Sequence, residues 1–143
     1  MTAEEARARL AGARVAHLAT ASVAGRPHVV PCSFALLDDH TIVSAVDHKP
    51  KRTTALRRLR NVTENPRVAL LADHYDDRDW DALWWVRADG AGRVLAPEEP
   101  EARRAVEALR ARYAQYGPQP PRGPVLAVDV DRWTGWLAAP PVA

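Results

Sequence analysis

The segment VAHLATASVAGRPHVVPCSF, residues 15–34, has the pattern of two β-strands joined by a tight turn. Val15–Thr20 and His28–Phe34 are rich in apolar and β-branched residues, which favour extended backbone. Between them, Gly25 can adopt the positive φ angle that a hairpin turn requires. We therefore predict an antiparallel hairpin, since strands joined by so short a connection pair antiparallel.

Further strand patterns follow along the chain. A turn at Asp38-Asp39 leads into a strand over Thr41–Val46, which would complete a three-stranded meander. The later patterns are Arg67–Ala72, then Leu83–Ala88 and Gly92–Leu95 as a second hairpin around Gly90, and finally Val125–Asp131. The sequence thus predicts about six antiparallel strands rather than a doubly wound parallel sheet. A Rossmann nucleotide site is not indicated, because no G-x-G-x-x-G motif follows a strand.

Three helical patterns lie between the strands, at residues 2–13, about 50–65 and about 97–116. The first opens on a capping box formed by Thr2 and Glu5. The second ends at Asn65-Pro66, because proline disfavours helical backbone at the residue before it. We expect one mainly β domain over residues 1–143, with inserted helices and a small closed or half-closed barrel.

Composition narrows the class of protein. The 143 residues are 47% hydrophobic and 27% charged, as in an ordinary globular domain. Cys32 is the only cysteine, and the five histidines lack metal-binding spacing, so no metal site is expected. A net charge of +2 is too small to indicate nucleic-acid binding. The N-terminus has no apolar core of a signal peptide and no apolar run could span a membrane, so we expect a cytoplasmic protein.

The segment DHKPKRTT, residues 47–54, concentrates positive charge where a helix begins. Pro50 suits the first helical position, and the first turn of a helix leaves backbone N–H groups and partial positive charge unpaired. Cations placed there repel unless an anion lies between them, which indicates a phosphate cradle. The residues assigned to it are Lys49, Lys51 and Arg52, with the hydroxyls of Thr53 and Thr54, and with His48 beside them. The alternative is a solvated basic helix face.

Three motifs along the chain carry a family resemblance. LATASVAGRPHVVPCSF (residues 18–34), KPKR (49–52) and NPRVAL (65–70) resemble the pyridoxamine-phosphate-oxidase-like split-barrel superfamily. DHYDDRDWDALWWVRADG (73–90) is similar to one subgroup of its branch that uses the deazaflavin coenzyme F420. The resemblance spans nearly the whole chain. It implies a split β-barrel of the FMN-binding type and a homodimer with its cofactor in a groove between subunits.

The resemblance also implies roles for particular residues. The cradle of Lys49, Pro50, Lys51 and Arg52 would hold the cofactor phosphate, and Val30, Pro31 and Ser44 would lie near the ring or the ribityl chain. Arg57, Arg58 and Arg60 would extend the positive charge toward the glutamate tail of the deazaflavin. The five tryptophans either line a substrate pocket or pack a core or dimer interface.

The implied function is an F420-dependent oxidoreductase that transfers a hydride between the cofactor and a small organic substrate. No side chain is then required as a catalytic nucleophile or base, because the cofactor supplies the chemistry. FMN is the second cofactor candidate, and a non-catalytic carrier is the alternative to an enzyme. The additional C-terminal segment of true pyridoxamine phosphate oxidases is not found, so that particular activity is not expected.

Overall fold

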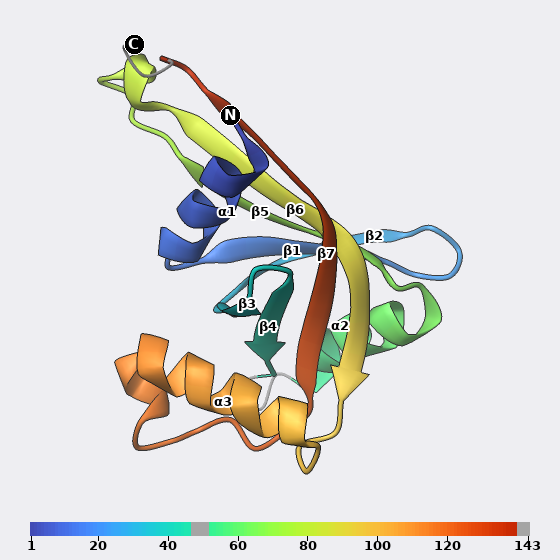
Figure 1. Ribbon diagram of the computed structural model, residues 1–143. Helices are drawn as coiled ribbons and strands as arrows, with labels where there is room; N and C mark the ends of the chain where they lie inside the picture. Colours follow the sequence, from blue (N-terminus) through green and yellow to red (C-terminus); the bar gives the residue numbers. More distant parts are fainter. Residues whose placement is uncertain (47–51, 140–143) are drawn as a thin grey trace.

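The computed structural model describes residues 1–46 and 52–139, with side chains from Arg57 onward in the second range. Seven strands form one antiparallel sheet in the order β2-β1-β5-β6-β7-β4-β3 (Figure 1). Their bounds are β1 Ala16–Ala21, β2 Pro27–Cys32, β3 Ala35–Asp38, β4 Thr41–Ala45, β5 Arg67–His74, β6 Trp84–Leu95 and β7 Val125–Leu137. Among the described residues no pairing joins β2 to β3, so the sheet stays open, as a split barrel does.

The predicted first hairpin is confirmed. β1 and β2 pair antiparallel with Leu18 opposite Val30, and Gly25 has a φ of 84° in the turn. The turn is closed by a hydrogen bond from the Gly25 N–H to the Ser22 carbonyl at 2.9 Å. The side chains of β1 alternate between buried and more exposed positions, so one face of the hairpin packs on the core.

The predicted three-stranded meander is wrong. β2 ends at Cys32, and the chain crosses to the opposite edge of the sheet, where β3 pairs with β4. Phe34 holds this crossing, because its side chain is fully buried. The Tyr113 hydroxyl also bonds both the amide and the carbonyl of Phe34 at 3.1 Å. A local strand pattern cannot reveal such a crossing, because both halves remain extended.

The predicted hairpin around Gly90 is also wrong. β6 runs unbroken through Gly90 and pairs with β7, which continues past the predicted end at Asp131 to Leu137. A Cβ atom on Gly90 would lie only 2.2 Å from the carbonyl oxygen of Asp129. The glycine therefore marks a close approach of two backbones beside a bulge, and not a turn. The sheet has seven strands where the sequence predicts about six, and β3 is the strand that the pattern did not predict.

The three predicted helices are present as α1 (Ala3–Gly12), α2 (Arg52–Glu64) and α3 (Pro100–Arg112). α1 begins with the predicted capping box, in which the Glu5 amide donates to the Thr2 hydroxyl at 3.1 Å. α1 covers the core built around Leu18 and Leu70, whereas α3 covers a second core around Val43. None of the described helices is long and apolar enough to cross a membrane.

The distal ends of β5, β6 and β7 project beyond the helices as an arm (Figure 1). Its tip, residues 73–83, contains the short helix η1 (Trp80–Ala82) and is called the arm tip below. The arm is tied together by the pairs His74 with Trp84 and Trp84 with Leu137. α2 and the β1–β2 turn lie on the opposite side of the molecule from the arm tip (Figure 1).

Candidate functional site

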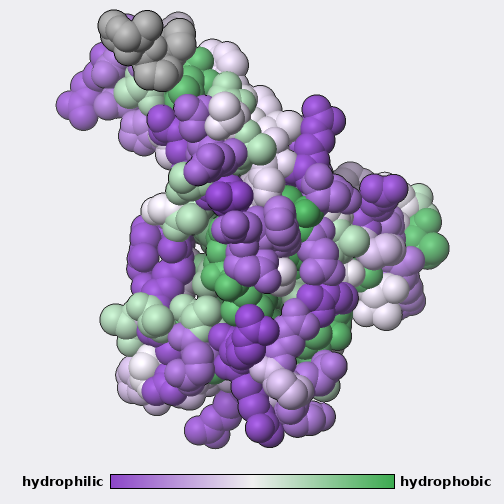
Figure 2. All heavy atoms as spheres, in the orientation of Figure 1, coloured by the Kyte–Doolittle hydropathy of each residue, from purple (hydrophilic) through white to green (hydrophobic). Residues whose placement is uncertain are grey.

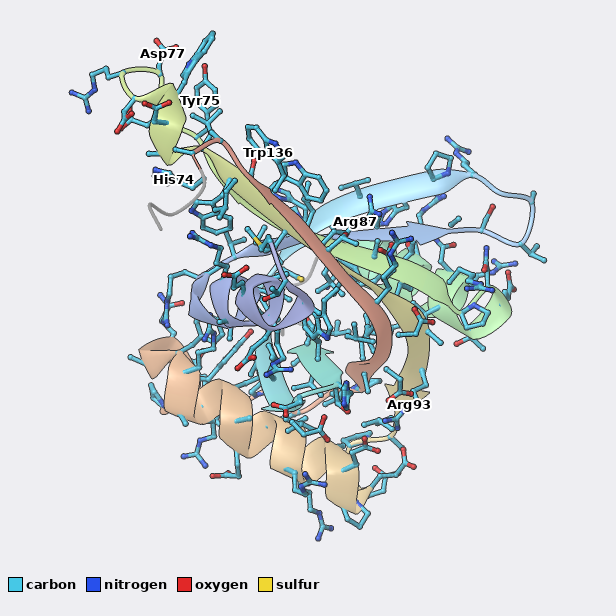
Figure 3. The ribbon with its side chains drawn as sticks, turned by 45° about the horizontal axis from the view of Figure 1, so that its top comes forward. His74, Tyr75, Asp77, Arg87, Arg93 and Trp136 are labelled. Carbon is cyan, nitrogen blue, oxygen red and sulfur yellow. The ribbon has the colours of Figure 1, made fainter. Side chains whose placement is uncertain are left out.

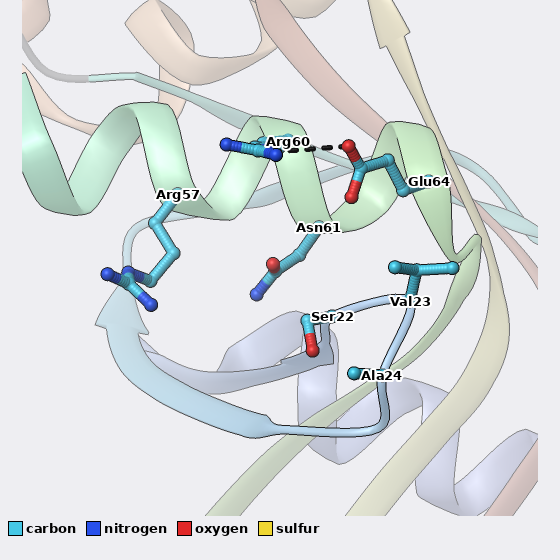
Figure 4. A pocket seen from close by; sticks show the side chains of 7 residues that line it. All are labelled: Ser22, Val23, Ala24, Arg57, Arg60, Asn61 and Glu64. Atoms are coloured by element: carbon cyan, nitrogen blue, oxygen red, sulfur yellow. Dashed lines mark hydrogen bonds and ion pairs between the residues drawn. The ribbon is translucent and has the colours of Figure 1, made fainter.

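A basic groove lies between the β1–β2 turn and α2 (Figure 4). It consists of two adjoining cavities of about 390 and 230 Å³ that share Ser22, Arg57 and Asn61. The remaining lining residues are Val23, Ala24, Arg60 and Glu64 in the first cavity and Arg26, Pro27 and His28 in the second. We call this the α2 groove. Its lining carries three arginines against one carboxylate, so it suits an anionic ligand.

Two side-chain amides position α2 over the hairpin. Asn61 donates to the Thr20 hydroxyl at 3.1 Å, and both side chains are buried. Near the end of the helix, Asn65 donates to the Ser22 carbonyl at 3.4 Å. Arg57 precedes Asn61 by four residues, so both lie on the same face of the helix, toward the turn. Arg60 pairs with Glu64 at 3.2 Å on the exposed side, which leaves Arg57 as the uncompensated cation of α2 in this lining.

His28 lies in the second cavity, on the face of β2 that points toward α2. Its Nδ1 atom and the Nε atom of Arg58 are buried, and neither has a hydrogen-bond partner among the described residues. Burial lowers the pKa of His28, and the positive charges of Arg57 and Arg58 lower it further. An anion in the groove would relieve the repulsion between His28 and Arg57, so the groove lining fits a phosphate or carboxylate group.

Most of the predicted phosphate cradle cannot be placed. His48, Lys49, Pro50 and Lys51 lie outside the described residues, and Arg52 begins α2 with a side chain that is not described. Of the predicted extension, Arg57 and Arg60 line the α2 groove, whereas Arg58 does not. The cradle motif directly precedes the helix that forms one wall of this groove.

Val30 and Pro31 point to opposite faces of β2. Val30 is half-buried on the same face as His28 and packs against the core, whereas Pro31 is exposed on the other face. Their side chains therefore cannot both contact one ligand from the same side of the strand. The structure does not bring them together with Arg57 in the groove lining.

Ser44 is 4% exposed on β4 and lies away from the groove lining. Its hydroxyl donates to the Ser33 carbonyl at 2.7 Å, so it fastens β4 to the crossing between β2 and β3. Burial raises the pKa of the neighbouring Cys32 thiol, while a hydrogen bond with Ser44 opposes that rise. Cys32 is thus a buried core residue.

The tryptophans divide among three environments. Trp133 packs against the core, and Trp84 does so beneath the guanidinium of Arg9, 5.3 Å from its ring. Trp85 and Trp136 are cross-strand neighbours on the face of the sheet opposite α1. Trp80 is 66% exposed at the arm tip. None of them lines the α2 groove.

Sequence reasoning did not single out His28, Ser22 or Asn61 for this site. In the sequence, no metal spacing or motif distinguishes His28 from the other histidines. Its role depends on the register that sets it opposite Thr20, and on the packing of α2 across that pair. Neither can be derived from local pattern. The one signal available was the density of arginines on the following helix.

One comparison with known proteins identifies a family. Residues 2–137 match the family model described as pyridoxamine 5'-phosphate oxidase. No curated protein matches the sequence.

Several solved structures share the fold at low sequence identity. A conserved hypothetical protein from Mycobacterium tuberculosis is 24% identical with a TM-score of 0.71, over 100% of this chain and 91% of its own. A FAD-binding protein from Mesorhizobium loti is 20% identical with a TM-score of 0.72, over 94% of each chain. The heme storage protein from Vibrio cholerae is 15% identical with a TM-score of 0.70, over 94% of this chain and 90% of its own. These likenesses show the fold alone.

Proposed function

Because this chain belongs to the pyridoxamine 5'-phosphate oxidase family, we propose that it is an oxidoreductase that uses the deazaflavin coenzyme F420. It would transfer a hydride between this cofactor and a small organic substrate. The observation that carries the proposal is the arginine-lined α2 groove, in which His28 lies beside the uncompensated positive charge of Arg57.

The charge of the groove matches the anionic parts of the cofactor. A deazaflavin coenzyme carries a phosphate and a glutamate tail, and both need cationic or N–H partners. Lys49 and Lys51 come immediately before Arg52, the first residue of α2, so the cradle motif and the groove belong to one continuous basic segment. We assign the phosphate to the cradle and the carboxylates of the tail to Arg57 and its neighbours.

The bound cofactor would supply the hydride chemistry, whereas this chain would bind and orient it. Arg57 and Arg60 would fix the charged end of the cofactor. This division of roles agrees with a groove lining of arginines, small residues and amides.

Two alternatives have support of their own. FMN is the second cofactor, and a FAD-binding protein of the same fold favours a flavin. A non-catalytic carrier is the second function, and a heme storage protein of the same fold favours a binding role.

Parallel titrations distinguish these assignments. Purified protein is titrated with coenzyme F420, FMN and heme under identical conditions, followed by fluorescence or absorbance. We expect F420 to bind with micromolar or better affinity and the protein to purify colourless from a host that lacks F420. Stoichiometric yellow FMN in the purified protein would instead favour FMN. Steady-state oxidation of reduced F420 by added unsaturated or carbonyl acceptors then separates an enzyme from a carrier.

We further propose that the functional unit is a homodimer. The face of the sheet opposite α1, called the outer face below, carries five apolar side chains with His17 and Arg87 among them: Val29, Pro31, Leu71, Trp85 and Trp136. Val29 is 62% exposed and Trp136 is 47% exposed. Apolar patches of this kind rimmed by charges are typical of interaction surfaces. Figure 2 shows apolar atoms reaching the surface near the β1–β2 turn and along the arm.

A further inference from the structure

The second cavity of the α2 groove holds one histidine among arginines. This cavity of about 230 Å³ is lined by Ser22, Arg26, Pro27, His28, Arg57 and Asn61. Among the residues that the structure describes, no carboxylate lines it. A charged imidazole on His28 would therefore meet cations and no anion of the protein, so the lining by itself favours the neutral ring.

The charged groups that face His28 among the described residues are all positive. α2 contributes Arg57 and Arg58, and the β1–β2 turn contributes Arg26. Burial lowers the pKa of His28, and the charges of Arg57 and Arg58 lower it further. Each of these effects opposes protonation of the imidazole.

The acid of the groove belongs to the other cavity. Glu64 lines only the first cavity, and its carboxylate accepts a hydrogen bond of 3.2 Å from Arg60. Thr20, which lies opposite His28 on β1, is uncharged. In the described part of the chain, an anion that pairs with a protonated His28 must therefore come from a ligand.

The second cavity already offers hydrogen-bond donors to such a ligand. The Ser22 hydroxyl accepts a hydrogen bond of 3.0 Å from the amide of Arg26, so its own proton can be donated. The guanidinium groups of Arg26 and Arg57 are donors only. Phosphate, sulfate and carboxylate groups are acceptors, and they bind most strongly to charged donors. An anion in this cavity therefore binds the imidazolium form of His28 better than the neutral ring.

We propose that the second cavity is a proton-linked anion site, in which His28 becomes charged when an anionic group binds between it and Arg57. The imidazole takes one proton from solvent, and the anion then faces an imidazolium. Because such coupling is reciprocal, the affinity for the anion rises as pH falls. The inference rests on the proposed function for the identity of the anion, which is a carboxylate of the cofactor tail.

A titration with a simple anion tests the site without any cofactor. Sulfate is the probe, because it stays doubly negative throughout the titration. The imidazole C–H resonance of His28, assigned by its absence in His28→Gln, is followed against pH in sodium sulfate and in sodium chloride of equal ionic strength. We expect sulfate to raise the pKa of His28 by about one pH unit, an effect typical of an adjacent opposite charge. Arg57→Ala should lose most of this effect.

His74 provides the matched control. Figure 3 shows it on the arm, away from the β1–β2 turn. Its ring stacks on Trp84, 6.4 Å between centroids, and it does not line the α2 groove. The resonance of His74 should follow pH identically in both salts.

Calorimetry extends the test to coenzyme F420. Heats of binding in two buffers of different ionisation enthalpy give the proton uptake, which should be present in the parent and in His74→Gln and absent in His28→Gln. The parent should bind F420 roughly tenfold more tightly at about pH 5.5 than at about pH 8, since one pKa unit corresponds to tenfold in affinity. A titration of the ligand itself would affect all three proteins alike, so the difference between them isolates His28.

The outcomes separate this inference from the cofactor assignment. If sulfate leaves the titration of His28 unchanged, the cavity is not a proton-linked anion site. If F420 binds with the same pH dependence in the parent and in His28→Gln, the inference is overturned and the cofactor assignment stands. A parent that shows the sulfate effect but does not bind F420 would retain the proton-linked site and overturn the cofactor assignment.

Discussion

The side-chain amide of Asn61 donates a hydrogen bond of 3.1 Å to the hydroxyl of Thr20, with both side chains buried where α2 crosses β1. This bond joins the helix that carries Arg57 to the strand opposite His28. The width of the α2 groove therefore depends on a contact within the core. A ligand would meet a groove whose two walls are already fixed.

We expect Asn61→Leu to lower the free energy of unfolding by about 1–3 kcal/mol, because it leaves a buried hydroxyl without a partner. Thr20→Val should have a similar effect through the stranded amide. The double variant should lose clearly less than the sum of the two, since both polar groups are then absent. Urea denaturation of the four proteins measures this coupling, and strictly additive losses would contradict the role given to the bond.

His28 should make stability depend on pH. Burial and the charges of Arg57 and Arg58 lower its pKa below the ordinary value of about 6.5. The unfolded chain then binds more protons than the folded chain as pH falls below that value, so the free energy of unfolding should decrease. Denaturation midpoints between about pH 7.5 and 5.5 should fall less steeply in His28→Gln.

Arg57→Ala provides the matched comparison for His28. Removing this positive charge should move the pKa of His28 back toward its ordinary value and weaken the same pH dependence. If stability depends on pH identically in the parent, His28→Gln and Arg57→Ala, the charge of Arg57 does not affect the titration of His28.

Leu71→Glu should break the dimer. Leu71 is 36% exposed at the centre of the outer face, so a buried carboxylate would appear there only on association. Val94→Glu is the matched control, because Val94 is equally exposed but alternates to the opposite face of β6. Light scattering should give the mass of one chain for Leu71→Glu and of two chains for the parent and the control. Equal masses in all three would remove the outer face from the interface.

Local sequence signals predicted the parts of this fold that depend on local chemistry. The capping box of α1 and the glycine of the first turn both formed as expected, because each depends on residues within five positions. The predictions of strand pairing failed where contacts with residues distant in sequence determine the structure. Gly90 looks like a turn residue in the sequence, but in the structure it allows the close approach of β7. The residues around Phe34 look like one continuous strand, but a hydrogen bond to Tyr113 holds the chain where it crosses to the other edge of the sheet.

The candidate site shows the same difference between features that depend on local sequence and features that depend on distant contacts. The arginines of α2 are visible in sequence because they cluster on one helix, and two of them line the groove. Val30 and Pro31 came from resemblance alone, and adjacent strand residues necessarily face opposite ways. Ser44 carries a hydroxyl that looks available in sequence, but its hydrogen bond to Ser33 across the crossing engages it in the structure.

The most direct test of the central claim is a calorimetric titration of coenzyme F420 into the parent and three single variants, Lys51→Ala, Arg57→Ala and Arg103→Ala. Loss of one charge-assisted hydrogen bond costs about 1.5–3 kcal/mol, which corresponds to roughly ten- to a hundredfold in affinity. We expect that loss for Lys51→Ala and Arg57→Ala, and a change within about twofold for Arg103→Ala, whose exposed side chain lies on α3. If all three variants bind F420 as the parent does, the basic segment is only a solvated helix face and the cofactor assignment is contradicted.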